Sequence, residues 1–425
     1  MKYSVLPSKI SGHLFVPPSK SHTLRSLLFA LMASGRSVIH NYLPSPDTRA
    51  MLRAIELFGA KIKVLDSCIE IEGRGNCLLR PKDVIQAGNS GLVFRLSTAL
   101  ASLLDSYVII TGDESIRTRR IIDPLLKALS RCNVFAVSSA HDGHAPVIVK
   151  GPLYPGDIII ENGEDSQLVS SVLIALSFLP GESTLRVVQS GEHSWVNVTL
   201  AWLHQLGGRI VHDQFQRYHV VGNLQYDGFD RTIPGDFSTA SYSIAAAVIS
   251  KQGIKISGLN MCDSQPDKAF IDILQKMGVH LWYCSQRDIL EICAGQSLRG
   301  IKIDLNHCID LLPTLAVLAC FAETPTEISG VRIARFKESN RITAVIQELQ
   351  KMGGHLEEKE DGLLIYPSSL RGCEVFSHRD HRIALSLLVA GLGAVGETSV
   401  VDVRCISKTY PNFLSDFLSI GARIY

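Results

Sequence analysis

Apolar positions along this 425-residue chain recur as an amphipathic helix that ends in glycine before a β-branched strand. The pattern is seen in LRAIELFGAKIKV, TLAWLHQLGGRIV, FIDILQKMGVHLW, VIQELQKMGGHLE and FLSDFLSIGARIY. Glycine suits the left-handed backbone that ends a helix. A weaker copy, PLLKALSRCNVFAV, lacks the glycine, and we predict its turn at Ser130. The turns therefore fall at intervals of 68 to 77 residues, which predicts six copies of one unit, at Gly59, Ser130, Gly207, Gly278, Gly353 and Gly421.

A second kind of helix also recurs six times, with a polar start and a body of small apolar residues. Bodies such as YSIAAAVIS, LLPTLAVLACF and IALSLLVAGLGA are apolar nearly all round, which is typical of a helix buried inside a domain. Short β-rich runs such as GDIIIE and TSVVDVR lie between the two kinds of helix. Each unit is therefore predicted to run strand, buried helix, strand, surface helix, strand.

Six such units favour an α/β (α+β) protein of two domains with three units each, rather than one very large sheet. The stretch YDGFDRTIPGDFS (226–238) divides the third unit from the fourth. We predict an N-terminal-type domain of residues 19–235. The second domain combines residues 1–18 with 236–425, and the chain crosses between the domains near 17–19 and 230–236.

Composition narrows the classes of function that fit this chain. Hydrophobic residues make up 46% and charged residues 20%, and the formal net charge is +1, so no bulk field points to nucleic acid or membrane. The N-terminal stretch lacks the apolar run of a signal peptide, and the ten cysteines include no C-x-x-C pair. We therefore expect a cytoplasmic protein without a metal or cofactor, and any anion site must be a local cluster.

Cations stand in unusual places, at the starts of buried helices and in the loops before surface helices. Lys20 and Arg25 fall in the first turns of a helix, where the dipole disfavours positive charge. Lys337 and Arg341 lie four residues apart, so they share a helix face and repel unless an anion lies between them. If the buried helices run parallel, their N-termini and these cations meet at one face of each domain. We therefore predict an anion-binding site there.

Eight motifs carry a resemblance over the full chain, namely PPSKSHTLR, GNSG with a following Arg, GDESIRTRR, DSQ, PGDFSTASY, KESNRI, DHRIALS and SKTYPNF. In this order they resemble the 5-enolpyruvylshikimate-3-phosphate synthase family. The resemblance implies a two-domain enolpyruvyl-transferase fold, each domain being three βαβαββ units around buried parallel helices, an inside-out α/β barrel. It implies transfer of the enolpyruvyl group of phosphoenolpyruvate to the 5-hydroxyl of shikimate 3-phosphate, in aromatic amino-acid biosynthesis. It also implies sensitivity to glyphosate.

The resemblance also implies roles for individual residues. The residues implied to bind phosphoenolpyruvate are Lys20, Asn89, Gly91, Arg119, Arg341, Arg382 and Lys408, with Arg95 in support. Those implied to bind shikimate 3-phosphate are Lys20, Ser21, Arg25, Ser166, Gln167, Asp310 and Lys337. The catalytic residues are implied to be Lys20, Asp310, Lys337 and Glu338. We expect a monomer with no cofactor, no metal and no partner beyond its two substrates.

Four positions depart from the family pattern. Asp165 and Glu192 stand where serines commonly contact the shikimate phosphate, and a carboxylate there would repel a dianion. Leu92 replaces a small threonine, and Arg120 stands where Arg-Pro is usual.

Three other interpretations stay open from the sequence. UDP-N-acetylglucosamine enolpyruvyl transferase shares the implied fold, but its loop cysteine has no counterpart in residues 112–124. A phosphate- or nucleic-acid-binding module would need a basic face with stacking aromatics, whereas aromatic residues are 7% of this chain. A purely structural repeat scaffold gives no reason for cations at buried-helix starts.

Since the family's chemistry needs a water-poor site, we expect substrates to close the two domains about the crossings.

Overall fold

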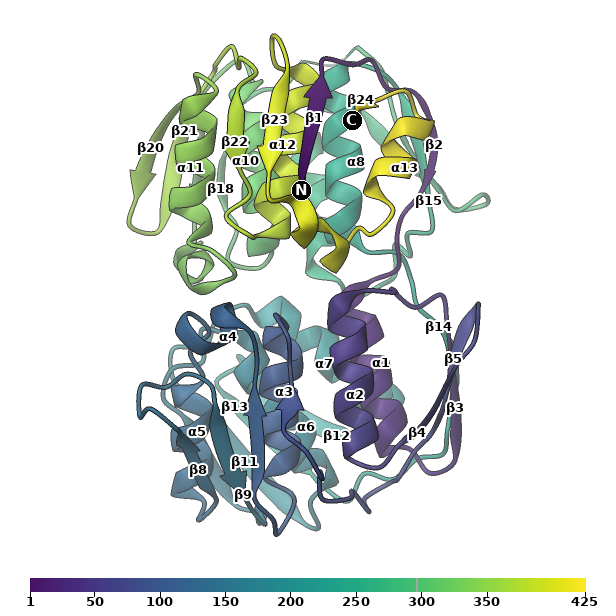
Figure 1. Ribbon diagram of the computed structural model, residues 1–425, viewed down its shortest axis with the longest axis vertical. Helices are drawn as coiled ribbons and strands as arrows, with labels where there is room; N and C mark the ends of the chain where they lie inside the picture. Colours follow the sequence, from purple (N-terminus) through teal and green to yellow (C-terminus); the bar gives the residue numbers. More distant parts are fainter. Residues whose placement is uncertain (296) are drawn as a thin grey trace. The chain divides into compact units, whose positions relative to one another are not determined.

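The computed structural model describes residues 1–295 and 297–425 and divides into two compact units (Figure 1). Unit 1 comprises Met1–Ser19 and Pro234–Tyr425, and unit 2 comprises Lys20–Ile233. No helix in the described residues is long and apolar enough to cross a membrane.

Unit 2 is built around three helices that are buried along most of their length. They are α1 (Lys20–Met32), α3 (Gly91–Ala101) and α6 (Ser166–Phe178). Shorter or more amphipathic helices lie outside them, namely α2 (Pro46–Leu57), α4 (Glu114–Thr118), α5 (Asp123–Arg131) and α7 (His193–Gln205). The strands are β3 (Arg36–His40), β4 (Lys61–Val64), β5 (Cys68–Glu72), β6 (Ile85–Gln86), β7 (Val108–Thr111), β8 (Phe135–Ser138), β9 (Val147–Lys150), β10 (Asp157–Ile160), β11 (Glu182–Val187), β12 (Arg209–Asp213), β13 (Arg217–Val221) and β14 (Asp230–Thr232).

Unit 1 repeats the arrangement around α8 (Phe237–Ser250), α10 (Leu312–Cys320) and α12 (His381–Gly393). Its surface helices are α9 (Ala269–Lys276), α11 (Arg341–Lys351) and α13 (Phe413–Ser419). Short 3-10 helices precede α9, α10, α11 and α13, namely η1 (Pro266–Lys268), η2 (Ile309–Leu311), η3 (Arg332–Phe336) and η4 (Val403–Lys408). The strands are β1 (Lys2–Leu6), β2 (Gly12–Phe15), β15 (Ile254–Ser257), β16 (Leu281–Cys284), β17 (Ile289–Ile292), β18 (Lys302–Asp304), β19 (Thr326–Ser329), β20 (His355–Lys359), β21 (Gly362–Tyr366), β22 (Glu374–Phe376), β23 (Thr398–Val401) and β24 (Arg423–Ile424).

The strands of the described residues form six four-stranded sheets with one common pattern. In each sheet one outer pair of strands is parallel and the other two pairs are antiparallel, as in β10-β11-β13-β12. In four of the six sheets the two parallel strands flank a buried helix in the sequence, and antiparallel pairs such as β12-β13 follow a surface helix. The predicted α/β class and its sixfold βαβαββ repeat are therefore confirmed.

Two strands pair in one unit although the helix that follows each of them in the sequence belongs to the other unit. β2 comes directly before α1 but pairs with β15 of unit 1, Gly12 opposite Ile254. β14 comes directly before α8 but pairs with β3 of unit 2, Asp230 opposite Val38. The periodic pattern alone places each strand beside the helix that follows it, whereas the predicted domain bounds assign residues 1–18 to the second domain and residues 19–235 to the first.

The weak sixth copy of the surface helix turns at a different residue from the one predicted. Ser130 lies inside α5, whose C-cap is Cys132, and Asn133 carries the positive φ of 61°. Asn133 thus occupies the place that Gly59 and Gly207 hold after α2 and α7. The prediction of a turn at Ser130 was wrong because asparagine also tolerates the left-handed conformation, so no glycine was needed.

Helix starts are fixed by short polar side chains. Ser90, Asp165, Asp236 and Asp380 are N-caps of the buried helices α3, α6, α8 and α12, and each accepts a hydrogen bond from a backbone amide of the first turn. Because these N-caps fix where each helix begins, charged side chains one to five residues after a cap are held at the helix N-terminus.

Candidate active site

Unit 1 gathers three cations and three carboxylates at the starts of α11 and α12 and the neighbouring 3-10 helices. We call this group the arginine cluster, and its members are Asp310, Glu338, Arg341, Asp380, Arg382 and Lys408. Within the described residues, no group of His, Cys, Asp or Glu has an arrangement that could hold a metal ion.

Arg341 is the centre of the arginine cluster. Its Nη1 donates to Asp310 Oδ1 at 2.6 Å, its Nη2 to Glu338 Oε2 at 2.6 Å and its Nε to Asp380 Oδ2 at 2.8 Å. The Arg341 side chain is only 2% exposed. Burial lowers the pKa of Arg341, but the three carboxylates outweigh burial and raise that pKa well above its ordinary value. The guanidinium is therefore a permanent cation whose three edges are all occupied.

Arg382 and Lys408 share the same carboxylates. Arg382 Nη2 donates to Asp310 Oδ2 at 2.6 Å, and Lys408 Nζ donates to Glu338 Oε1 at 2.8 Å. Each of these two carboxylates thus bridges two cations. Burial raises the pKa of Asp310, yet Arg382, Arg341 and the nearby Lys337 lower it to about 2. Asp310 in this state is a very weak base.

Asp380, the first residue of the DHRIALS motif, belongs to the cluster although no site role was predicted for it. It is fully buried, and besides Arg341 it accepts hydrogen bonds from Ser339 Oγ at 3.1 Å and from the amide of Arg382 at 2.9 Å. It therefore caps α12 and anchors Arg341 at once. The only sequence signal for this role was an aspartate directly before a helix start that carries cations. Any aspartate that caps a helix gives the same signal.

In unit 2, Arg95 joins residues from α3 and α6. Its Nη2 lies 2.8 Å from Asp165 Oδ2, and its Nη1 donates to Gln167 Oε1 at 3.2 Å. Arg95 therefore neutralises Asp165, the carboxylate that we expected to repel the shikimate phosphate. A Cβ added to Gly91 would lie 2.7 Å from Arg95 Nη1, so the glycine is needed for this approach.

Arg25 is held inside unit 2 among hydroxyl groups. It donates to Ser21 Oγ at 2.5 Å and to Thr199 Oγ1 at 2.9 Å, and burial lowers the pKa of Arg25 to about 10. Lys20 Nζ lies 3.7 Å from a carboxylate oxygen of the buried Asp47. The cations of the opening motif are thus already in contact with polar groups of the chain.

The other predicted residues of unit 2 are distributed less closely. Ser166 donates from its amide and its Oγ to the buried Glu192, both at 3.1 Å. Asn89 Nδ2 donates to Asp113 at 2.6 Å. Arg119 lies exposed at the C-cap of α4.

The sixfold repeat and the cations held at helix starts, taken with the eight motifs, define an enolpyruvyl transferase. Comparison with known proteins identifies the family: the sequence profile of EPSP synthase (3-phosphoshikimate 1-carboxyvinyltransferase) matches residues 6–417. The chain therefore belongs to the EPSP synthase family.

Relatives agree with this assignment, and a solved structure has the same fold. The chain is 40% identical to a 3-phosphoshikimate 1-carboxyvinyltransferase of Chlamydia caviae, over all of this chain and 94% of that protein. It is 38% identical to one of Ruminiclostridium cellulolyticum, over all of this chain and 99% of that protein. The fold matches EPSP synthase from Acinetobacter baumannii with a TM-score of 0.83 at 24% identity, covering all of this chain and 99% of that one.

The predicted transferase activity is thereby confirmed, namely transfer of the enolpyruvyl group of phosphoenolpyruvate to shikimate 3-phosphate in the shikimate pathway. The alternatives of a UDP-N-acetylglucosamine enzyme or a nucleic-acid-binding module are not favoured by these matches.

Proposed function

We propose that the arginine cluster binds the carboxylate end of phosphoenolpyruvate and that its carboxylates handle the protons of the reaction. The observation that carries this proposal is the sharing of Asp310 between Arg341 and Arg382, both at 2.6 Å. Two guanidinium groups that converge on one carboxylate form a site of the right charge and shape for another carboxylate. Asp310 thus occupies the place that the substrate would take.

This arrangement supports a mechanism in which binding of the substrate activates the general base of the reaction. While Asp310 is paired with Arg341 and Arg382, its pKa of about 2 makes it too weak to accept a proton from a hydroxyl group. When the substrate carboxylate takes over the two arginines, Asp310 loses its cations and its pKa rises. Asp310 then accepts the proton of the 5-hydroxyl.

The remaining proton transfers are assigned to Glu338 and Lys337. In the first step a proton is delivered to the methylene carbon of phosphoenolpyruvate, and the 5-oxygen forms a bond to C2. In the second step the bond between C2 and the phosphate oxygen breaks, phosphate leaves with the electron pair, and the methyl group returns a proton. Lys408 Nζ donates to Glu338 Oε1 at 2.8 Å, and this contact would hold the carboxylate in position for these transfers.

The substrate contacts in unit 2 are assigned on the resemblance. We propose that Lys20, Asn89, Gly91 and Arg119 bind the phosphate end of phosphoenolpyruvate. We assign shikimate 3-phosphate to Lys20, Ser21, Arg25, Ser166 and Gln167, together with Asp310 and Lys337 of unit 1. The hydrogen bonds of Ser21 to Arg25 and of Gln167 to Arg95 support this, because they hold both polar side chains beside a cation.

The decisive experiment is phosphate release from phosphoenolpyruvate, measured with and without shikimate 3-phosphate. Release should require shikimate 3-phosphate in the wild type. Asp310→Asn should reduce turnover at least a hundredfold while leaving shikimate 3-phosphate binding measurable, because the amide cannot accept the hydroxyl proton. Release without the second substrate, or normal turnover in Asp310→Asn, would contradict the assignment.

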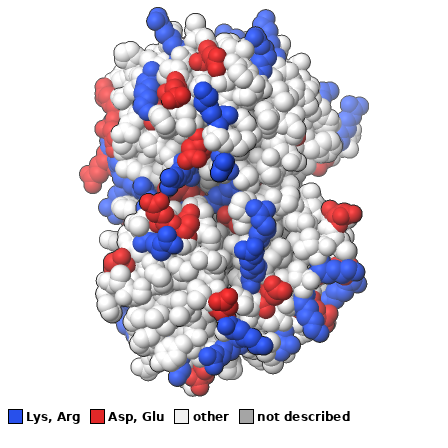
Figure 2. All heavy atoms as spheres, viewed as in Figure 1, with Lys and Arg blue, Asp and Glu red and all other residues white. Residues whose placement is uncertain are grey.

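We further propose that the chain acts as a cytoplasmic monomer without nucleic-acid or membrane partners. Positive and negative side chains are interspersed on the face shown in Figure 2, in keeping with a net charge of +1. Light scattering should give the monomer mass at assay concentration. Salt-dependent retention on DNA, RNA or anionic vesicles would contradict the proposal.

A further inference from the structure

Asp267, in η1, is a buried carboxylate for which neither the sequence nor the proposed mechanism gave a role. Its exposed fraction is 0%. Its Oδ2 accepts a very close hydrogen bond from Ser238 Oγ at the start of α8, and its Oδ1 has no hydrogen-bond partner in the described residues. A carboxylate left partly unsatisfied in the interior is costly unless it has a function or carries a proton.

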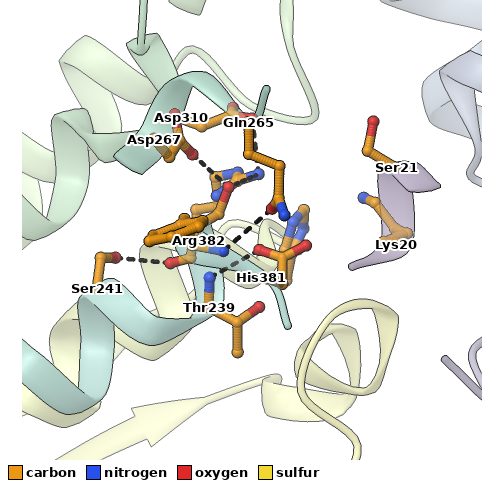
Figure 3. Close-up of polar contacts among 12 residues, drawn as sticks. Lys20, Ser21, Thr239, Ser241, Gln265, Asp267, Asp310, His381 and Arg382 are labelled. Atoms are coloured by element: carbon orange, nitrogen blue, oxygen red, sulfur yellow. Dashed lines mark hydrogen bonds and ion pairs between the residues drawn. The ribbon is translucent and has the colours of Figure 1, made fainter. Parts of the chain in front are cut away.

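Ser238 connects Asp267 to the arginine cluster. Its Oγ lies 3.5 Å from Arg382 Nη2, the same nitrogen that bonds Asp310 at 2.6 Å. Figure 3 shows Asp267, Asp310 and Arg382 close together beside the start of α8. A continuous line of polar contacts therefore runs from Asp267 through Ser238 and Arg382 to Asp310.

The segment that carries Asp267 is fixed against α8. Gln265 accepts from the amide of Phe237 at 3.1 Å and donates to the carbonyl of Gly235 at 2.9 Å. The neighbouring Lys268 donates to the carbonyls of Met261 and Asp263 at 2.8 and 2.9 Å. The nearest lysine in sequence is thus occupied by backbone carbonyls, and Asp267 depends on the cluster for its electrostatic environment.

The charged and titratable groups that face Asp267 come from several elements: Asp310 of η2, Arg382 of α12, Asp236 before α8, and Cys308 before η2. Burial, with a smaller contribution from Asp310 and Asp236, raises the pKa of Asp267 to about 7, although Arg382 and the Ser238 hydrogen bond oppose the rise. Asp267 therefore changes charge near neutral pH.

We propose that Asp267 is a positioning residue, which holds Arg382 through Ser238 and controls by its charge how available Arg382 is to the carboxylate of phosphoenolpyruvate. This inference rests on the proposed role of Arg382 in binding that substrate. When Asp267 is neutral, Arg382 has one anionic partner, Asp310. When Asp267 ionises, its negative charge attracts the same guanidinium and repels the incoming carboxylate. Binding of phosphoenolpyruvate should therefore weaken as pH rises through neutrality.

The test compares wild type with Asp267→Asn, which keeps an oxygen acceptor for Ser238 but cannot ionise. The KM for phosphoenolpyruvate should rise roughly fivefold more in wild type than in Asp267→Asn between pH 6 and pH 8.5, with kcat changing less. The control is Asp272→Asn, the same change at an exposed position of α9, which should follow wild type. The titration of the substrate's own phosphate is common to all three proteins and cancels in the comparison.

A second variant and a measurement of stability guard against misfolding as an explanation. Ser238→Ala should shift the rise in KM to higher pH, because the lost hydrogen bond favoured the ionised carboxylate. The folded protein binds the Asp267 proton more tightly than the unfolded chain. Wild type should therefore lose stability relative to Asp267→Asn as pH rises from about 4 to about 7.

If the KM for phosphoenolpyruvate changed with pH in the same way in wild type and in an active Asp267→Asn, the proposed role of Asp267 would be wrong. The proposed function would not be affected by that result. A pH-independent stability difference would likewise contradict the role of Asp267. A wild type that releases no phosphate in the presence of shikimate 3-phosphate would overturn the proposed function and this inference together.

Discussion

Replacing Arg341 by methionine tests how the arginine cluster is held together. Methionine fills much of the arginine volume but removes the cation that three carboxylates share. Two of those carboxylates would keep another cation, since Asp310 still contacts Arg382 and Glu338 still contacts Lys408. Asp380 would keep the neutral donors Ser339 Oγ and the Arg382 amide, with the His381 ring 3.7 Å away.

The expected loss is therefore that of one buried, uncompensated carboxylate rather than of three ion pairs. Removing one partner of a buried pair typically costs about 3–5 kcal/mol of the free energy of unfolding. The loss should shrink on acidification. The pKa of Asp310 is lowered to about 2 in the folded protein, so its stabilisation is present above the unfolded pKa of about 3.9 and disappears as pH falls toward 2. Without Arg341 the carboxylates protonate at higher pH, which relieves their mutual repulsion.

Calorimetry at pH 7 and pH 4 is the suitable assay, because two compact units can unfold in separate transitions. The matched control is Arg131→Met, which removes an ion pair of the same 2.6 Å length to Glu161 with both side chains half exposed. That change should cost at most about 1 kcal/mol. Arg341→Lys should fall between the two, because one ammonium cannot bond three carboxylates in three directions. A loss below about 1 kcal/mol in Arg341→Met at pH 7, or an equal loss at pH 4, would refute the reasoning.

Three further predictions concern individual residues. Glu338→Ala should reduce turnover far more than affinity for shikimate 3-phosphate, and near-normal steady-state turnover would remove Glu338 from the mechanism. Glyphosate should inhibit competitively with phosphoenolpyruvate, because Gly91 presents no side chain, and full activity at high glyphosate would defeat this prediction. Glu348→Gln should lose about 1–3 kcal/mol in urea unfolding at pH 7 and less near pH 4, because Lys351, the Phe376 amide and His378 lower the pKa of the buried Glu348; an unchanged midpoint would contradict it.

The helices and their order could be predicted from sequence because their signals are local. The glycines after α2, α7, α9, α11 and α13 have positive φ, as the turn pattern requires. The all-apolar bodies of α8 and α12 are buried along nearly their whole length. These features depend on residues within a few positions of one another, so a single sequence contains them.

The partners of the site residues could not be predicted in the same way. Arg341 and Asp380 are 39 residues apart in the sequence, and Asp310 and Arg382 are 72 apart. The sequence pattern indicated cations that repel one another. It gave no sign that carboxylates from distant parts of the chain lie beside these cations. Asp165 was interpreted as repelling a phosphate, although Arg95 compensates its charge. The strands that pair with β2 and β14, namely β15 and β3, could not be predicted for the same reason, because pairing depends on residues far away in the chain.

The position of β1 has a consequence for the order in which the protein is made. β1 pairs with both β23 and β24, and Ser4 exchanges two backbone hydrogen bonds with Tyr425. β1 is therefore an inner strand of a sheet whose other members are translated long after it. Unit 2 is one continuous stretch, Lys20–Ile233, and all of its strands exist before the first helix of unit 1 has been synthesised. β1 must stay without its sheet partners throughout that time, so synthesis of β23 and β24 is a condition for closing this sheet.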